Sequence, residues 1–176
     1  MSIKHNSLNT NKLILIRRSS IHGMGVYAKA DIPKGSRIIE YVGDKITKKE
    51  ADRRADALEQ LRKKKTHLGE VYIFELSKRY DIDGNVPYNK ARYINHSCEP
   101  NTEVEIIRGK IWIVAIKEIK NGDEIFYNYG YGYENFHHYK CQCRTERCVG
   151  YIVAEEHWPR IKMWEISRCI GKKRQK

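Results

Sequence analysis

Arg92-Tyr-Ile-Asn-His-Ser-Cys-Glu-Pro-Asn101 is the stretch of this sequence in which polar chemistry is densest. Its ten residues include a guanidinium, two amides, an imidazole, a hydroxyl and a thiol. Asn and Ser side chains compete for backbone hydrogen bonds and favour turns, and Pro100 cannot continue a strand ladder. The stretch therefore predicts an irregular segment, which is either an ordinary surface loop or a functional site whose partners lie elsewhere in the chain.

Length and charge limit the classes of protein to consider. A chain of 176 residues suits one domain, or one domain with a small appendage, and can bury a core without disulfides. Its 34 Lys and Arg against 22 Asp and Glu give a net charge of +12, which favours anionic partners. The basic runs at 62–65 and 172–176 are candidate contacts with nucleic acid or chromatin, although each run alone is more typical of a solvated surface.

The sequence indicates neither a membrane span nor secretion. No apolar run approaches the ~20 residues that cross a bilayer, and the expected N-terminal tail, 1–12, lacks the apolar centre of a signal peptide. Five cysteines gathered late in the chain make a poor disulfide framework, so we expect a reducing, intracellular compartment. That compartment would be the nucleus or chromatin for a eukaryotic or host-directed protein, and otherwise the cytoplasm.

Short apolar segments separated by turns predict a β-rich α+β domain. One helix is expected from about 47 to 65, because Thr47 and Glu50 form a capping box before a helical pattern of apolar residues. Expected strands lie at 13–16, 26–28, 37–42, 71–76, 80–83, 103–107, 110–116 and 124–129.

The segment His22-Gly-Met-Gly-Val-Tyr-Ala28 formally matches the G-x-G-x-x-A pattern of dinucleotide-binding folds. That pattern needs a helix beginning at the glycines, and the turn at 33–35 leaves no room for one. We therefore expect these glycines to shape a turn or to let the backbone pass close to another group.

Cys141, Cys143 and Cys148 have the spacing of ligands in a tetrahedral zinc site. Structural zinc takes four ligands, so one must come from elsewhere in the chain; unpaired thiols without metal are the plain alternative. The candidates for the fourth ligand are Cys98, Cys169, His137 and His138.

Taken together, six motifs resemble the SET-domain protein lysine methyltransferases with a cysteine-rich post-SET segment. The resemblance covers roughly residues 13–151, and the cysteine-rich pre-SET module of many histone-modifying members is absent. The motifs, in order, are His22–Gly25, Glu40–Asp44, Tyr72–Leu76, Arg92–Asn101, Gly122–Gly130 and the cysteines at 141–148.

The resemblance implies a fold of small β-sheets with a pseudoknot, in which one segment is threaded under another. It also implies a longer helical insert and a C-terminal zinc segment. The expected divisions are a tail at 1–12, a SET domain at 13–136 with its insert at 47–65, a post-SET segment at 137–151, and a C-terminal helix and basic tail at 152–176. Trp158, Ile161 and Trp164 have the spacing of a short helix packed on the domain.

The resemblance also implies a site. The cofactor would be S-adenosylmethionine, and Cys98 would complete a structural zinc site with Cys141, Cys143 and Cys148. The substrate lysine would enter from the opposite face, through a channel whose catalytic residues would be Tyr41, Tyr127 and Tyr129. Cofactor contacts would come from Gly23, Met24, Gly25, Tyr72, Arg92, Asn95, His96 and Tyr129.

This reading predicts transfer of a methyl group to a lysine amine, by default on a histone tail, with a non-histone protein as an open alternative. Tyr127 occupies what resembles the family's product-specificity position, and its hydroxyl favours a monomethyl product. A basic zinc-binding nucleic-acid module would explain the charge and the cysteines but not Asn95, His96 and Tyr129. A non-catalytic peptide-binding scaffold is disfavoured because Tyr41 and Tyr129 are both present.

Overall fold

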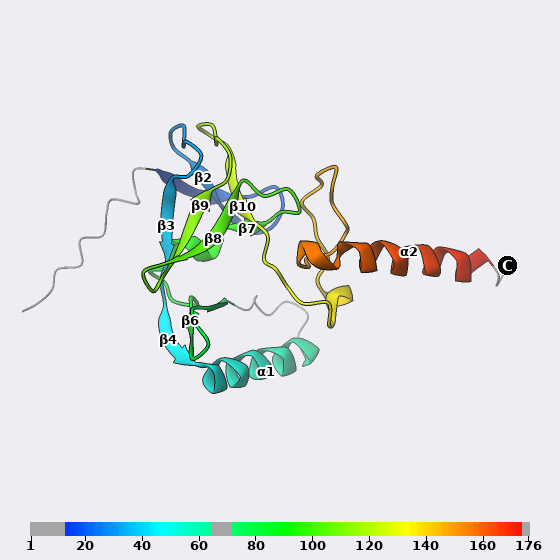
Figure 1. Ribbon diagram of the computed structural model, residues 1–176. Helices are drawn as coiled ribbons and strands as arrows, with labels where there is room; N and C mark the ends of the chain where they lie inside the picture. Colours follow the sequence, from blue (N-terminus) through cyan, green and yellow to red (C-terminus); the bar gives the residue numbers. More distant parts are fainter. Residues whose placement is uncertain (1–12, 65–71, 174–176) are drawn as a thin grey trace, which may run out of the picture.

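The computed structural model describes residues 13–64 and 72–173. Within these ranges the chain forms ten strands and two α-helices, which confirms the predicted β-rich α+β class. Figure 1 shows the sheets gathered in one body, with α1 lying along its lower edge and α2 projecting away from it. None of the described helices is long and apolar enough to cross a membrane.

The first sheet brings the polar stretch 92–101 beside a distant strand. Its order is β1 (Ile14–Arg18), β2 (Met24–Ala28), β10 (Glu124–Tyr127) and β7 (Asn95–His96). β7 runs parallel to β10, with Tyr127 opposite His96, whereas the other pairs are antiparallel. Parallel strands need a long connection between them. The pairing of β7 with β10 places two candidate site residues, His96 and Tyr127, side by side.

Two three-stranded antiparallel sheets complete the body. One has the order β3-β9-β8, with β8 and β9 joined by a tight turn at 108–109, and the other has the order β4-β6-β5. Short 3₁₀ turns occur at Lys90–Tyr93, Phe136–His138 and Glu155–His157. The strands are β3 (Arg37–Tyr41), β9 (Lys110–Ala115), β8 (Thr102–Ile107), β4 (Asp44–Thr47), β6 (Tyr80–Asp83) and β5 (Ile73–Glu75).

The predicted strand at 124–129 is two residues too long, because β10 ends at Tyr127. The Asn128 side chain accepts a hydrogen bond from the Gly130 N–H at 2.9 Å, and Gly130 has a φ of 66°. An Asn side chain that caps its own turn competes with strand pairing. Tyr129 consequently leaves the sheet and points toward other elements.

Helix α1 (Lys48–Lys64) lies within one residue of the predicted bounds at each end. The Glu50 N–H donates to the Thr47 hydroxyl at 3.3 Å, which is one half of the predicted capping box. The Glu50 carboxylate instead accepts hydrogen bonds from Arg53 and Arg54 at 2.7 and 2.8 Å. Charge-assisted bonds to guanidinium are stronger than a bond to a neutral amide, which accounts for this choice.

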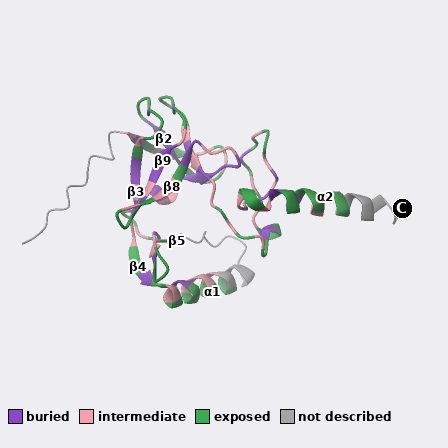
Figure 2. Cartoon of the chain, viewed as in Figure 1, coloured by how far each residue is buried: buried purple, intermediate pink, exposed green. Residues whose placement is uncertain are grey.

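Two apolar cores hold the chain, as the buried segments in Figure 2 show. The larger core fills the sheets, and the smaller one packs Cys98 and the cysteine segment against the start of α2 (Trp158–Lys173). Trp158 and Ile161 are buried there as predicted, but α2 is much longer than the short helix expected, and most of its described side chains, up to Ser167, are exposed. The side chains of the basic runs at 62–65 and 172–176 lie outside the described part of the structure.

Candidate active site

A cavity of about 530 Å³ is lined mainly by aromatic side chains from β3, β5, β10 and the segment after β10. The three predicted channel residues, Tyr41, Tyr127 and Tyr129, all contribute to its wall. The structure therefore brings together side chains from three strands that are distant in sequence. The other lining residues are Tyr72, Ile73, Phe74, Glu75, Arg92, Gly130, Tyr131, Gly132, Glu134 and Tyr139.

The aromatic rings of this cavity touch one another in a continuous series. The Phe74 ring lies 4.5 Å from that of Tyr41 and 5.6 Å from that of Tyr127, between centroids. Tyr127 and Tyr129 are 4.9 Å apart, and Tyr131 follows at 5.7 Å from Tyr129. Aromatic faces attract cations and accommodate aliphatic chains, so the cavity suits a lysine side chain.

Tyr41 is 2% exposed, and its hydroxyl donates a hydrogen bond to the Tyr72 carbonyl at 2.9 Å. Burial raises the pKa of Tyr41, and the negative charge of Asp83 acts in the same direction. The phenol therefore remains neutral at physiological pH. It can orient a polar group as a hydrogen-bond partner but cannot serve as a phenolate base.

Tyr129 stands between the aromatic cavity and a second cavity of about 340 Å³. Its hydroxyl donates to the Ile94 carbonyl at 3.0 Å, and its backbone N–H donates to Nδ1 of His96 at 3.2 Å. His96 and Asn95 line the second cavity together with His22. The Tyr129 ring is thus held at the junction of the two cavities by the polar stretch at 92–101.

Asn95 ties the glycine segment to this junction. Its amide nitrogen donates to the Met24 carbonyl at 3.1 Å and to the Glu124 carboxylate at 2.9 Å. A Cβ on Gly25 would overlap that same carboxylate, so any larger residue there would have to displace the Glu124 side chain. Gly25, in β2, therefore lets the backbone pass close to another group, which is one of the two roles expected for these glycines.

Arg92 carries an unsatisfied donor at the wall of the aromatic cavity. Its Nε is buried without a hydrogen-bond partner among the described residues, and its guanidinium lies 4.8 Å from the Tyr72 ring centroid. Buried donors in proteins nearly always have partners. A carboxylate such as that of S-adenosylmethionine would satisfy it, so the residues present fit the cofactor that the resemblance implies.

The four cysteines expected to bind zinc come together in space. Their sulfur atoms all lie within 4.8 Å of one another. The Cys98 sulfur is 3.8 Å from that of Cys141 and 4.0 Å from that of Cys148. Thiolates about 2.3 Å from a tetrahedral zinc ion lie ~3.8 Å apart, so the geometry fits zinc.

Proton sharing among these thiols supports a cation site. The hydrogen bond between the Cys98 and Cys141 thiols lowers the pKa of Cys98 and raises that of Cys141. A divalent cation would take the place of that shared proton, since zinc binds thiolates. His137 and His138 are not part of this cluster in the described chain, and the Cys169 side chain lies outside the described part.

Comparison with known proteins identifies the family. A model of the SET domain matches residues 23–130, which is more than half of the chain. The chain belongs to the SET-domain family. Its motifs had implied this resemblance, and the small sheets and cysteine cluster agree with it.

Several curated proteins are similar over most of this chain. The variant-silencing SET domain-containing protein of Plasmodium falciparum is 36% identical over 145 residues, covering 80% of this chain and 6% of that protein. Human histone-lysine N-methyltransferase 2D is 33% identical over 140 residues, covering 77% of this chain and 2% of that protein. The H3 lysine-4 specific histone-lysine N-methyltransferase of Chaetomium globosum is 33% identical over 157 residues, covering 85% and 14%. The chain thus spans only a small part of the length of these relatives.

Within this SET domain, the predicted cofactor residues are divided between the two cavities. Tyr72 and Arg92 line the aromatic cavity, Asn95 and His96 line the second one, and Tyr129 lines both. Residues 23–25 line neither cavity, although the Asn95 amide contacts the Met24 carbonyl. A cofactor that contacts the whole predicted set would have to reach past Tyr129.

Sequence reasoning missed four residues of this site. Phe74 and Tyr131 belong to the ring series, and Tyr139 contributes to both cavities. Glu124 accepts hydrogen bonds from Tyr27 and Ser19 as well as from Asn95. Phe74 and Glu124 lie inside quoted motifs, but nothing in the motifs distinguishes a cavity residue from a strand residue.

We expect about one zinc ion per chain, because structural zinc sites of this type hold a single ion. Metal analysis of purified, reduced protein measures the zinc content per chain. The number of reactive thiols should rise when a chelator is added. Folded, fully reduced protein that contains no zinc would contradict this prediction.

Proposed function

We propose that the protein is an S-adenosylmethionine-dependent protein-lysine N-methyltransferase. The observation that carries this proposal is the position of Tyr129, at the junction between an aromatic cavity and a second, more polar cavity, in a chain of the SET-domain family. Such a junction suits a reaction between two substrates that enter from different sides. Catalysis by positioning two reactants in line can supply a large share of a rate enhancement.

S-adenosylmethionine would supply an electrophilic methyl group. The lysine must present a neutral amine, and loss of its proton at pH 7 costs about 4.6 kcal/mol from an unperturbed pKa near 10.4. The aromatic wall around Tyr41, Tyr127 and Tyr129 would lower this cost, because a dry cavity disfavours the ammonium form. Tyr129 would orient the amine through its hydroxyl, and Arg92 would hold the cofactor's carboxylate.

We further propose a histone tail as the substrate. The human and Chaetomium relatives are named as histone-lysine N-methyltransferases, and that of Chaetomium as specific for H3 lysine-4. Histone tails reach chromatin-bound enzymes, so the protein would act in the nucleus or on chromatin. The divisions at 13–136, 137–151 and 152–176 are proposed as the SET domain, the post-SET zinc segment and the C-terminal helix with its tail.

Tyr127 is proposed to limit the product to monomethyl-lysine. Its side chain is 7% exposed and its ring packs against those of Phe74 and Tyr129, which would confine the space beside a lysine amine bound in this cavity. Tyr127→Phe removes the hydroxyl and should increase the fraction of di- and trimethyl product. Mass spectrometry of the methylated peptide measures the change. A trimethylated product from the unmodified protein would refute the role of Tyr127.

The proposed function is tested by incubating the protein with S-adenosylmethionine carrying a labelled methyl group. Recombinant histones and proteins of a cell lysate are offered as substrates, and labelled bands are identified by mass spectrometry. We expect label on a histone. Label only on other proteins would correct the proposed substrate, and binding of the cofactor without any transfer would contradict the proposed reaction.

A further inference from the structure

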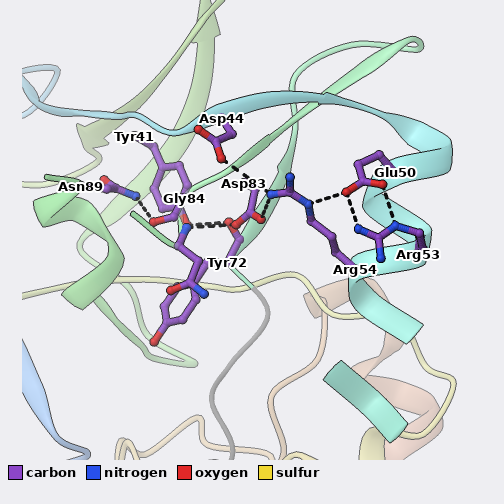
Figure 3. A network of polar contacts seen from close by, with 10 residues as sticks. Tyr41, Asp44, Glu50, Arg53, Arg54, Tyr72, Asp83, Gly84 and Asn89 are labelled. Atoms are coloured by element: carbon purple, nitrogen blue, oxygen red, sulfur yellow. Dashed lines mark hydrogen bonds and ion pairs between the residues drawn. The ribbon is translucent and has the colours of Figure 1, made fainter. Parts of the chain in front are cut away.

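We propose that Arg54 is a positioning residue for the aromatic cavity, which acts by holding the Asp83–Gly84 turn against Tyr41. The catalytic consequence rests on the proposed methyltransferase function, whereas the structural tie does not. Arg54 lies on α1, outside the motifs of the family resemblance, and it does not line the aromatic cavity. Its influence must therefore pass through other residues, and Figure 3 shows the network that connects it to Asp83, Gly84 and Tyr41.

The first link is the carbonyl oxygen of Tyr72. It accepts a hydrogen bond from the Tyr41 hydroxyl at 2.9 Å and another from the Gly84 N–H at 2.8 Å. A carbonyl oxygen has two lone pairs, so both donors are accommodated. The position of the Tyr41 hydroxyl in the cavity wall is therefore tied to the backbone of the Asp83–Gly84 turn.

The second link is direct packing at Gly84. A Cβ on this residue would overlap the ring and hydroxyl of Tyr41, so the turn lies in contact with the ring itself. On the other side, the fully buried Asn89 donates its amide to the Gly84 carbonyl at 3.1 Å. Gly84 is thus packed between Asn89 and the Tyr41 ring. Because packed groups transmit displacement, a shift of the turn would move Tyr41.

The third link is the carboxylate of Asp83, which lies at the end of β6. One oxygen accepts from the Asn85 N–H at 3.0 Å and closes the turn, while the other accepts from Arg54 Nη1 at 2.5 Å. Asp83 is also the register partner of Asp44 on β4. Like charges directly opposite on paired strands repel each other.

Arg54 offsets this repulsion. Its Nη1 is 3.8 Å from the Asp44 carboxylate as well as bonded to Asp83, so one guanidinium lies near both acids. Its Nε is held by Glu50, one turn earlier on α1, at 2.8 Å. Without Arg54, two carboxylates would face each other at the start of the turn, and we infer that the turn would loosen.

Arg53 provides a matched control on the same helix. It bonds the same Glu50 carboxylate, at 2.7 Å, but its side chain is 68% exposed. Among the contacts of the described residues, it has no ion pair with β4 or β6. Arg53→Ala and Arg54→Ala therefore remove the same charge and similar helix contacts, but only the second removes the tie to Asp83.

The structural arm of the test measures amide hydrogen exchange by mass spectrometry. Arg54→Ala should accelerate exchange in the peptide that contains residues 80–84 by about tenfold, because its local opening becomes easier. Arg53→Ala should leave this exchange as in the unmodified protein. Equal exchange in the two variants would overturn the proposal, and this result does not depend on any activity.

The catalytic arm separates positioning from general stability. Arg54→Ala should lower kcat by about tenfold while the dissociation constant of S-adenosylmethionine stays within about twofold, a pattern expected when only the transition state is affected. Arg54→Lys should recover part of the loss. In a Tyr41→Phe background the Arg54→Ala change should have little further effect, because no hydroxyl remains to be positioned.

Activity of Arg54→Ala equal to that of Arg53→Ala would overturn the proposal while the methyltransferase function stands. Additive effects of Arg54→Ala and Tyr41→Phe would also overturn it. An unmodified protein that methylates nothing would overturn the proposed function instead, and hydrogen exchange would then decide whether Arg54 holds the turn.

Discussion

Tyr129→Phe is expected to slow methyl transfer by about 100-fold or more, which corresponds to a loss of roughly 2.7 kcal/mol of transition-state stabilisation. The substitution removes the hydroxyl that donates to the Ile94 carbonyl at 3.0 Å and keeps the ring that lies between the two cavities. The backbone N–H bond to His96 is also kept. Cofactor binding should therefore change little, and calorimetry with S-adenosylmethionine measures this separately from turnover.

Tyr88→Phe is a suitable control, because that side chain is 65% exposed and lines neither cavity. It removes the same hydroxyl from the protein and should leave turnover unchanged. If Tyr129→Phe retained activity within about threefold of the unmodified protein, its hydroxyl would not be part of the transition state. The proposed role of Tyr129 would then be wrong.

Removal of the metal should weaken cofactor binding as well as stability. Structural zinc can contribute on the order of 10 kcal/mol to the folding of small domains, and the cysteine segment shares its small core with α2. Cys98→Ser should therefore lower the melting temperature strongly. It should also weaken binding of S-adenosylmethionine, because the Cys98 sulfur lies 3.6 Å from His96, which lines the second cavity.

His96 is the physical reason for this coupling. Its Nδ1 accepts the Tyr129 N–H, so its proton lies on Nε2, which faces the Cys98 sulfur at 3.6 Å. The imidazole is thus held between the four-cysteine cluster and the junction of the cavities. When Cys98 loses its metal, the orientation of His96 and the position of Tyr129 should both loosen.

The change is measured by calorimetry on chelator-treated protein and on Cys98→Ser. Cys169→Ser serves as the control, because the four clustered cysteines already supply the four ligands of a tetrahedral zinc site. Folded, metal-free protein that binds the cofactor as tightly as the zinc form would contradict the coupling. Recovery of binding after zinc is restored would support it.

The sequence predicted those parts of the fold that depend on local patterns. Thr47 and Glu50 located the start of α1, and the Arg108-Gly109 turn located the hairpin of β8 and β9. The end of β10 was predicted wrongly, because the Asn128 side chain bonds within its own turn. Periodicity carries no information about such side-chain competition.

The site depended on the family resemblance more than on local pattern. The motifs led to Tyr41, Tyr127 and Tyr129, and these do share one cavity. They could not indicate that Tyr139 joins both cavities or that Arg54 reaches Asp83, because both contacts depend on how distant segments pack. The choice of Cys98 over the histidines as fourth member of the cluster was likewise open from spacing alone.

The proposed lysine channel is tested most directly by tandem mass spectrometry of histones methylated by the unmodified protein and by Tyr129→Phe, in parallel, with equal amounts of bound cofactor. We expect one methyl group on a lysine side-chain nitrogen with the unmodified protein, and almost none with the variant. Methylation at a different type of residue, or equal lysine methylation by both proteins, would contradict the assignment of the aromatic cavity as a lysine channel controlled by Tyr129.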